Sequence, residues 1–91
     1  MDNEMKNERI KMVDLRVMLS QQNFRCALTG RELTSENCSI DHIVPLSKGG
    51  THTKDNAQLV VSEDNQAKGN LTEEEFVQLC RDTLAYTAQK K

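Results

Sequence analysis

The segment from Ile40 to Leu46 constrains the fold more than any other part of this sequence. It reads IDHIVPL, an apolar run with two adjacent polar residues, Asp41 and His42, inside it. A run of this length is typical of a buried strand, and burying an unpaired polar side chain costs free energy. The run therefore predicts a strand that keeps Asp41 and His42 for a chemical purpose. We interpret that purpose as a metal site with a general base beside it.

The length and composition of the chain fit one small domain. Its 91 residues are 36% hydrophobic and 29% charged, with 4 glycines and 1 proline. Such a chain can bury one modest core and lacks the composition of a disordered segment. Its apolar runs are too short to cross a membrane, and its polar first eleven residues are unlike a signal peptide. We therefore expect a single soluble, cytoplasmic domain over residues 1–91 that does not contact a membrane.

The cysteines argue against a disulfide framework. Cys26, Cys38 and Cys80 are odd in number and widely spaced, which suits reduced thiols in the cytosol. Because no C-x-x-C pair is present, we expect no structural zinc. We interpret all three as small, partly buried apolar residues.

The net charge of −2 argues against a nucleic-acid partner. Basic residues are scattered among acidic ones, so no basic block is available to follow a phosphate backbone. Folding could still gather basic side chains on one face, namely Arg25, Arg31, Lys48, Lys54 and Lys68. If the ligand is DNA, the isolated chain should bind it weakly and in a salt-sensitive manner. A bound cation, a protein partner or a second copy of the chain would then add affinity.

Long helices are predicted at both ends of the chain. Over residues 7–22, apolar side chains fall on two neighbouring helical stripes, and we favour core packing over partner binding for this face. Thr72 and Glu75 have the spacing of a capping box, which predicts a helix over residues 73–89. One face of that helix is also interpreted as core: Phe76, Leu79, Cys80, Thr83 and Leu84.

Between these helices the pattern predicts strands and a short helix. Residues 23–33 favour a short strand or hairpin. Residues 38–44 predict a strand that ends at Pro45, and residues 57–61 predict an antiparallel partner for it. A short helix is then expected over residues 63–68, with Ser62 as its N-cap and Gly69 ending it. The predicted class is α+β.

Several spaced elements of this central region resemble the signature of HNH endonucleases, a ββα-metal nuclease module. The matching elements are Asp41–Pro45 (DHIVP), Gly49–Gly50, Asp55–Asn56 and residues 64–69 (DNQAKG). The resemblance covers about residues 24–69 and includes a C-x-x-T-G turn that is similar to that of small phage and bacterial members. It implies a ββα-metal hairpin-helix core flanked by the N-terminal and C-terminal helices.

The resemblance also implies roles for individual residues. Asp41 and Asn65 would be metal ligands, His42 the general base, and Asn56 the residue that braces the loop and the histidine. Carboxylate and amide oxygens suit Mg²⁺ or Mn²⁺, and a histidine with a pKa of about 6.5 is mostly neutral at pH 7. Because adjacent residues of a regular strand face opposite sides, a bulge or strand-end twist is needed to bring Asp41 and His42 to one site.

Each of these residues taken alone has an ordinary interpretation. A single histidine in an apolar run is often a hydrogen-bonded core or edge residue, Asn56 fits an ordinary turn, and Asn65 fits the first turn of a helix. We interpret His52, in a polar loop, as a surface residue, with a DNA contact as the lesser alternative. Nucleic-acid contacts are predicted for three basic residues: Arg25, Lys48 and Lys68.

The sequence departs from the family pattern where many members carry two C-x-x-C pairs on a structural zinc. Thr29, Val61 and Asp64 stand where such cysteines would fall. We infer that packing of the two terminal helices replaces the metal clamp, so that a zinc chelator should leave the fold intact.

These observations predict a metal-dependent DNA endonuclease or nickase. The competing hypothesis is a non-catalytic docking module of a larger phage or defence DNA-processing assembly, favoured by the acidic balance and the apolar face of residues 7–22. A zinc-stabilised interaction domain ranks last. Plasmid cleavage with Mg²⁺ or Mn²⁺ distinguishes the first two hypotheses.

Overall fold

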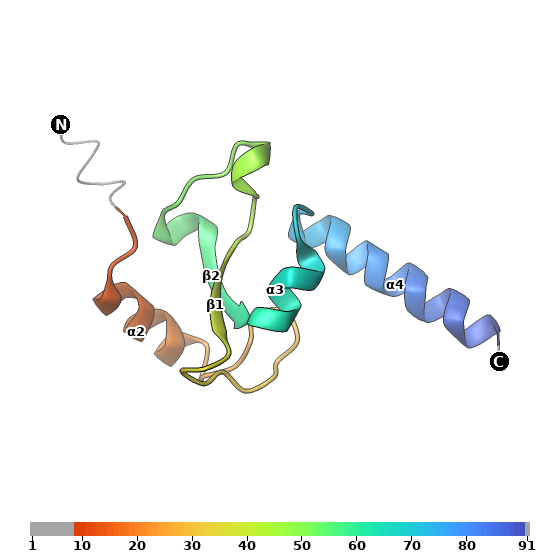
Figure 1. The fold of residues 1–91 in the computed structure, drawn as a ribbon, viewed down its shortest axis with the longest axis horizontal. Helices are drawn as coiled ribbons and strands as arrows, with labels where there is room; N and C mark the ends of the chain where they lie inside the picture. Colours follow the sequence, from red (N-terminus) through yellow and green to blue (C-terminus); the bar gives the residue numbers. More distant parts are fainter. Residues whose placement is uncertain (1–8, 91) are drawn as a thin grey trace.

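The structure, a computed structural model, describes residues 9–90 and has the predicted mixed α+β class. The helices and strands follow the order α2 (Met12–Gln21), β1 (Cys38–His42), β2 (Ala57–Val61), α3 (Ser62–Lys68) and α4 (Glu73–Gln89). Two short 3₁₀ helices, Leu46–Lys48 and Lys54–Asn56, lie in the long connection between the strands. The strands and α3 form a ββα unit with α2 beside it (Figure 1).

The strands β1 and β2 pair antiparallel as a two-stranded sheet. The register runs from Cys38 opposite Val61 to His42 opposite Ala57, and it advances by one residue on each strand throughout. Helix α2 packs against β2, and α3 packs against both strands (Figure 1). In agreement with this cover, β2 is buried at every residue except the polar Gln58. The prediction for residues 57–61 is confirmed, whereas β1 ends at His42, earlier than expected.

The hydrophobic core gathers side chains from β2, from the turn that precedes β1, and from α2. Its buried members are Cys26, Leu33, Leu59, Val60 and Val61. The predicted hairpin over residues 23–33 forms with a single bridge, between Arg25 and Glu32, rather than with regular strands. A backbone hydrogen bond of 3.0 Å from the Ala27 N–H to the Leu59 carbonyl ties this turn to β2.

Helix α3 ends as predicted but begins one residue earlier. Ser62 is its first residue rather than its cap, because both its N–H and its hydroxyl donate to the Asn37 carbonyl, at 2.7 and 3.0 Å. Gly69 follows the helix with a φ of +56°, a conformation that glycine adopts at little cost. These contacts fix where α3 meets the end of β2.

Helix α2 supplies the core from one of its two predicted stripes. It begins at Met12, where the Asp14 carboxylate accepts a hydrogen bond of 2.8 Å from the Lys11 N–H. Residues 7 and 8 of the predicted helix lie outside the described residues. Three side chains pack against the core, Leu15, Met18 and Leu19. Val13 and Val17 remain 59% and 49% exposed, so only part of the apolar face is used.

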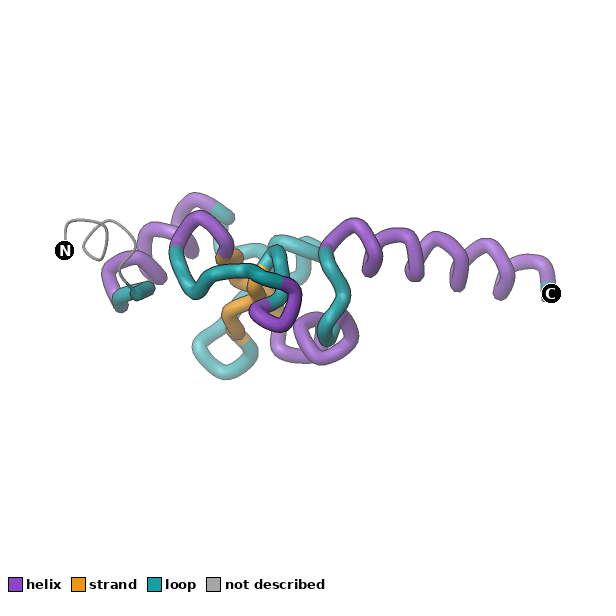
Figure 2. Tube along the Cα trace, turned by 90° about the horizontal axis from the view of Figure 1, so that it is seen from above, coloured by secondary structure: helices purple, strands orange, loops and turns teal. Residues whose placement is uncertain are grey.

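Helix α4 has the predicted bounds and cap but not the predicted packing. Thr72 and Glu75 form the capping box, with hydrogen bonds of 3.1 and 2.9 Å. The helix contains no buried residue, and Leu79 and Leu84 are 49% and 73% exposed. Figure 2 shows why, since α4 extends away from the rest of the chain. The expectation that its apolar face belongs to the core is therefore wrong.

The described residues, 9–90, include no helix with both the length and the apolar character that a membrane span requires.

Candidate active site

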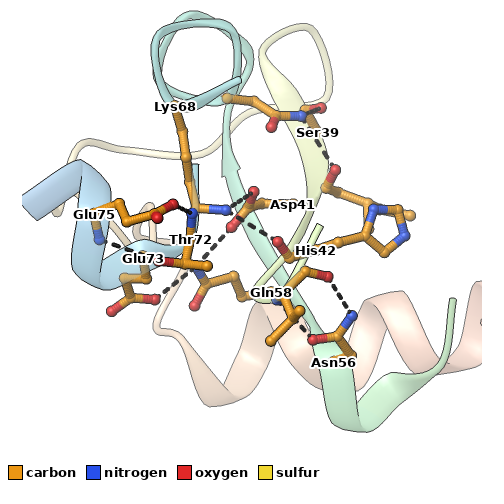
Figure 3. A network of polar contacts seen from close by, with 12 residues as sticks. Ser39, Asp41, His42, Asn56, Gln58, Lys68, Thr72, Glu73 and Glu75 are labelled. Carbon is orange, nitrogen blue, oxygen red and sulfur yellow. Dashed lines mark hydrogen bonds and ion pairs between the residues drawn. The ribbon is translucent and has the colours of Figure 1, made fainter. Parts of the chain in front are cut away.

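Asp41 is held in place from two sides at the buried face of β1. Its side chain is 3% exposed, its Oδ1 lies 3.0 Å from the Lys68 Nζ, and its Oδ2 accepts a hydrogen bond of 2.9 Å from the Gln58 Nε2. Lys68 reaches β1 from the last turn of α3, and Gln58 is the residue opposite Asp41 in the sheet. Figure 3 shows the carboxylate between these two side chains. The position of the Asp41 carboxylate is therefore fixed by partners on two different elements.

Lys68 is a buried member of this network. Its side chain is 0% exposed, and its ammonium group also donates to the His42 carbonyl at 3.0 Å. A buried charge is tolerated only when it is paired and hydrogen-bonded, and Lys68 meets both conditions. The predicted contact of Lys68 with nucleic acid does not fit this position, because the ammonium group is enclosed beneath Asp41.

The first turn of α4 joins the same network. The Gln58 Nε2 also contacts the Glu73 Oε1 at 3.1 Å, and the Lys48 ammonium lies 2.6 Å from the Glu75 Oε1. The hydrogen bond from Lys48, together with that from the Thr72 N–H, lowers the pKa of Glu75. Lys48, a predicted nucleic-acid contact, thus already has an acidic partner.

His42 occupies the last position of β1 and is only partly buried. Its Nε2 lies 2.7 Å from the Nδ1 of His52, with the ring centroids 5.0 Å apart. Burial is the largest of the effects that lower the pKa of His42, and His52 and Lys68 add to it against the opposing charge of Asp41. A lowered pKa increases the neutral fraction of the ring at pH 7, which is the form that accepts a proton.

The contact of His52 with His42 was not predicted, since the polar loop indicated a surface position, with a DNA contact as the lesser alternative. Its contact with His42 depends on how the loop from Val44 to Asn56 folds back over the end of β1. The glycine pair and the Asp55–Asn56 turn predicted a loop here but gave no signal of which side chain it would place over the strand.

Asn56 closes that loop with three hydrogen bonds. Its Oδ1 accepts from the Val44 N–H at 2.9 Å, and its Nδ2 donates to the carbonyls of Val44 and Thr51 at 2.9 and 2.8 Å. Gly50 lies inside the closure, because a Cβ at this residue would stand 1.8 Å from the Val44 carbonyl oxygen and 2.7 Å from the Asn56 Nδ2. The close approach of the two ends of the loop therefore requires glycine at this position.

Asn65 reaches β1 from α3. Its Nδ2 donates to the Ser39 Oγ at 2.7 Å and to the Ile40 carbonyl at 3.1 Å. Because the amide nitrogen is committed as a donor, the Oδ1 is the atom that remains to accept or to ligate.

Asp41, His42 and Asn65 line a single cavity of about 350 Å³ at the end of β1. The other lining residues come from β1, from the start of the loop and from the turn after α3: Ile40, Pro45, Leu46, Ser47, Gly69 and Asn70. The sheet register contains no bulge, and His42 is the last residue of β1. The donors fit a hard divalent cation, since a carboxylate oxygen and an amide oxygen share a cavity with room for water and phosphate ligands.

A second polar cluster joins the positions where many family members carry zinc-binding cysteines. The Asp64 Oδ2 accepts hydrogen bonds from the Cys26 Sγ at 3.0 Å and from the Thr29 Oγ1 at 2.6 Å, and the Cys26 Sγ accepts one of 3.3 Å from the Val61 N–H. Within residues 9–90, no group of three or more His, Cys, Asp or Glu side chains is placed to hold a metal ion. Hydrogen bonds join these positions instead. Of the two terminal helices, as described within residues 9–90, α2 packs against the core and α4 has no buried residue. The inference that packing of both terminal helices replaces the zinc clamp is therefore wrong.

Comparison with known proteins agrees with this geometry. A model of the family described as HNH endonuclease matches residues 24–71, a segment that includes Asp41, His42, Asn56 and Asn65. Among curated proteins, the CRISPR-associated endonuclease Cas9 of Corynebacterium diphtheriae is 42% identical over 53 residues. These residues make up 57% of this chain but 5% of the relative, so the chain spans only a small part of that protein.

Proposed function

The chain belongs to the HNH endonuclease family, and we propose that it is a metal-dependent DNA endonuclease or nickase that hydrolyses phosphodiester bonds. The observation that carries this proposal is the shared cavity at the end of β1, which is lined by Asp41, His42 and Asn65. The carboxylate of Asp41 and the amide of Asn65 can supply ligands for a cation, and the imidazole of His42 can supply a base in the same cavity.

His42 is the general base of the proposed reaction. Its lowered pKa favours the neutral ring at pH 7, which takes a proton from the attacking water. The water oxygen bonds to phosphorus in line with the departing 3′ oxygen, and the products are a 5′-phosphate and a 3′-hydroxyl. A divalent cation held by Asp41 and Asn65, most suitably Mg²⁺ or Mn²⁺, would supply stabilisation of the negative charge on the phosphate and on the leaving oxygen.

Lys68 and Gln58 prepare Asp41 for ligation. Each of them contacts one carboxylate oxygen, which fixes the orientation of Asp41 before any ligand arrives. Each carboxylate oxygen can accept more than one bond, so ligation does not require that these partners leave. Asn56 contributes by holding the loop closed over the cavity side of β1.

The proposed substrate is DNA, although the chain carries a formal charge of −2. Arg25 and Lys48 are both exposed, and we retain both as candidate phosphate contacts, Lys48 in competition with its pairing to Glu75. The match to a small part of a much longer endonuclease supports a setting in which a protein partner, a second copy or additional segments supply most of the DNA affinity. We place the activity in the cytoplasm, where the three free cysteines would stay reduced.

Incubation of the chain with supercoiled plasmid tests this proposal. We expect nicked or linear DNA with Mg²⁺ or Mn²⁺ and none with EDTA. The His42→Ala variant, folded to the same extent, serves as the matched control. A plasmid that stays supercoiled with the wild-type chain in either metal would contradict the proposal and favour the docking module.

A further inference from the structure

We propose that His52 is a positioning residue, which holds the ring of His42 so that its Nδ1 faces the reacting water. The inference rests on the proposed function, because it specifies which nitrogen of His42 takes the proton. It assigns a role to a residue that the sequence pattern placed only on the surface.

The contact between the two rings allows only one productive arrangement. The His42 Nε2 and the His52 Nδ1 are 2.7 Å apart, so one of them carries the hydrogen and the other accepts it. If His52 donated, a neutral His42 would carry its own hydrogen on Nδ1, and neither of its nitrogens could take a proton from water. If His42 donates through Nε2–H, its Nδ1 keeps a free lone pair. A base at His42 therefore requires His52 as the acceptor.

The same bond favours the product of proton transfer. When Nδ1 takes a proton from water, His42 becomes a cation whose Nε2–H still points at the His52 Nδ1. A hydrogen bond from a charged donor is stronger than the neutral one, so the bond tightens as the base works.

The loop that carries His52 is built to hold this position. The Asn56 side chain donates a hydrogen bond to the carbonyl of Thr51, the residue directly before His52. It also hydrogen-bonds to the N–H and the carbonyl of Val44. On either side of His52, the hydroxyls of Thr51 and Thr53 lie 2.9 Å apart. Gly50 permits the close crossing of the two loop ends. The bracing by Asn56 therefore reaches the catalytic ring through His52.

Kinetics of three variants of the 91-residue chain test the inference on supercoiled plasmid with Mn²⁺. His52→Ala removes the acceptor, and we expect kcat to fall by about tenfold to a hundredfold with KM unchanged, because orientation of a general base is lost. His52→Asn offers a carbonyl oxygen in place of Nδ1 and should recover most of kcat. Asp55→Ala, a change at an exposed residue of the same loop, should leave kcat unchanged. Thermal unfolding of each variant checks that the fold is retained.

Nitrogen-15 spectra of histidine-labelled protein report which ring nitrogen of His42 carries the hydrogen. A purely structural role of His52 would not change this tautomer. We expect neutral His42 to carry its hydrogen on Nε2 in the wild-type chain and in His52→Asn. In His52→Ala, the signal should shift toward a mixture of the two tautomers. A wild-type His42 with its hydrogen on Nδ1 would overturn the inference.

The kinetic outcomes separate this inference from the proposed function. A wild-type chain that leaves the plasmid intact would refute the nuclease itself. An active wild type with an equally active His52→Ala would overturn only the role of His52. A rise in KM with unchanged kcat would also overturn it, and would identify His52 as a DNA contact instead.

Discussion

Two buried carboxylates from the same central region have opposite surroundings. Asp41 and Asp64 are 3% and 6% exposed, so burial alone does not distinguish them. Asp41 is paired with the ammonium of Lys68 and lines a cavity beside a histidine. Asp64 accepts from the Cys26 thiol and the Thr29 hydroxyl and lies against a turn. Access to a cavity, rather than burial, therefore distinguishes Asp41, the carboxylate proposed to bind a cation, from Asp64.

Residues of the short helix α3 contact both the surroundings of Asp41 and the turn held by Asp64, so α3 is involved in the candidate site and in the stability of the fold. Lys68 of this helix pairs with Asp41, and Asn65 lines the same cavity as Asp41. Asp64 accepts hydrogen bonds from Cys26 and Thr29 in the preceding turn. One helix of seven residues thus contributes both to the candidate site and to the contacts that stabilise the fold. Variants of Asp41 and Asp64 should therefore differ in what they damage.

The largest expected effect is the loss of DNA cleavage when His42, which shares a cavity with Asp41, is replaced. His42→Ala should lower plasmid cleavage by about a hundredfold to ten-thousandfold, the usual contribution of a general base. The melting temperature should stay close to that of the wild type, because His42 is only partly buried. If His42→Ala cleaved at the wild-type rate, the cavity that His42 shares with Asp41 would not be the active site, and Asp41 would no longer differ from Asp64 in function.

The next largest effect is a loss of stability, because replacing Asp41 leaves the buried ammonium of Lys68 unpaired. Asp41→Ala should destabilise the fold by about 3–5 kcal/mol, because it strands the buried ammonium of Lys68 without a partner. Denaturant titration measures this loss. The double variant Asp41→Ala with Lys68→Met should recover most of the stability without recovering cleavage. Equal stability of the single and double variants would contradict the pairing.

Asp64 should show the reverse pattern. Asp64→Ala leaves the Thr29 hydroxyl and the Cys26 thiol without their acceptor and should cost about 1–3 kcal/mol of unfolding free energy. The rate of plasmid cleavage, measured well below the melting temperature, should match that of the wild type. A folded Asp64→Ala protein with a greatly lowered kcat would place Asp64 in the chemistry instead.

The smallest effect concerns the exposed cation on the Asp64 side. Arg31 lies 3.6 Å from the Asp64 Oδ1 and 3.2 Å from the Glu63 Oε1, with its side chain 60% exposed. Arg31→Gln should cost less than about 1 kcal/mol, since solvent and salt screen exposed pairs. Repeating the denaturant titration at 1 M NaCl should shrink even this difference. If Arg31→Gln cost as much stability as Asp41→Ala, the exposed pair of Arg31 with Asp64 would matter as much as the buried pair of Lys68 with Asp41, which would contradict the account.

Local signals predicted much of this fold. The capping box at Thr72 and the glycine after Lys68 set helix ends that the structure reproduces, because these signals act within a few residues. The apolar run of β2 was equally clear. The packing of α4 was not predictable in this way, since an amphipathic pattern states which face prefers cover but not whether another element lies against it.

For the candidate site, the sequence led to a set of candidate residues but not to their contacts. Asp41, His42 and Asn65 line one cavity, as the family resemblance led us to expect. The burial of Lys68 and the approach of His52 depend on how α3 and the loop cross β1, which no local pattern encodes. The sequence therefore predicted Lys68 as a nucleic-acid contact and His52 as a surface residue, with a DNA contact as its lesser alternative.

A calorimetric titration of Mn²⁺ tests the central claim most directly, namely that Asp41 and Asn65 together hold a cation beside His42. We predict that the wild-type chain binds Mn²⁺ at one site and that Asp64→Ala binds it equally well. Asn65→Ala, and the double variant Asp41→Ala with Lys68→Met, should bind it at least about tenfold more weakly, a loss of about 1.4 kcal/mol. Wild-type affinity in both of these variants would contradict the account.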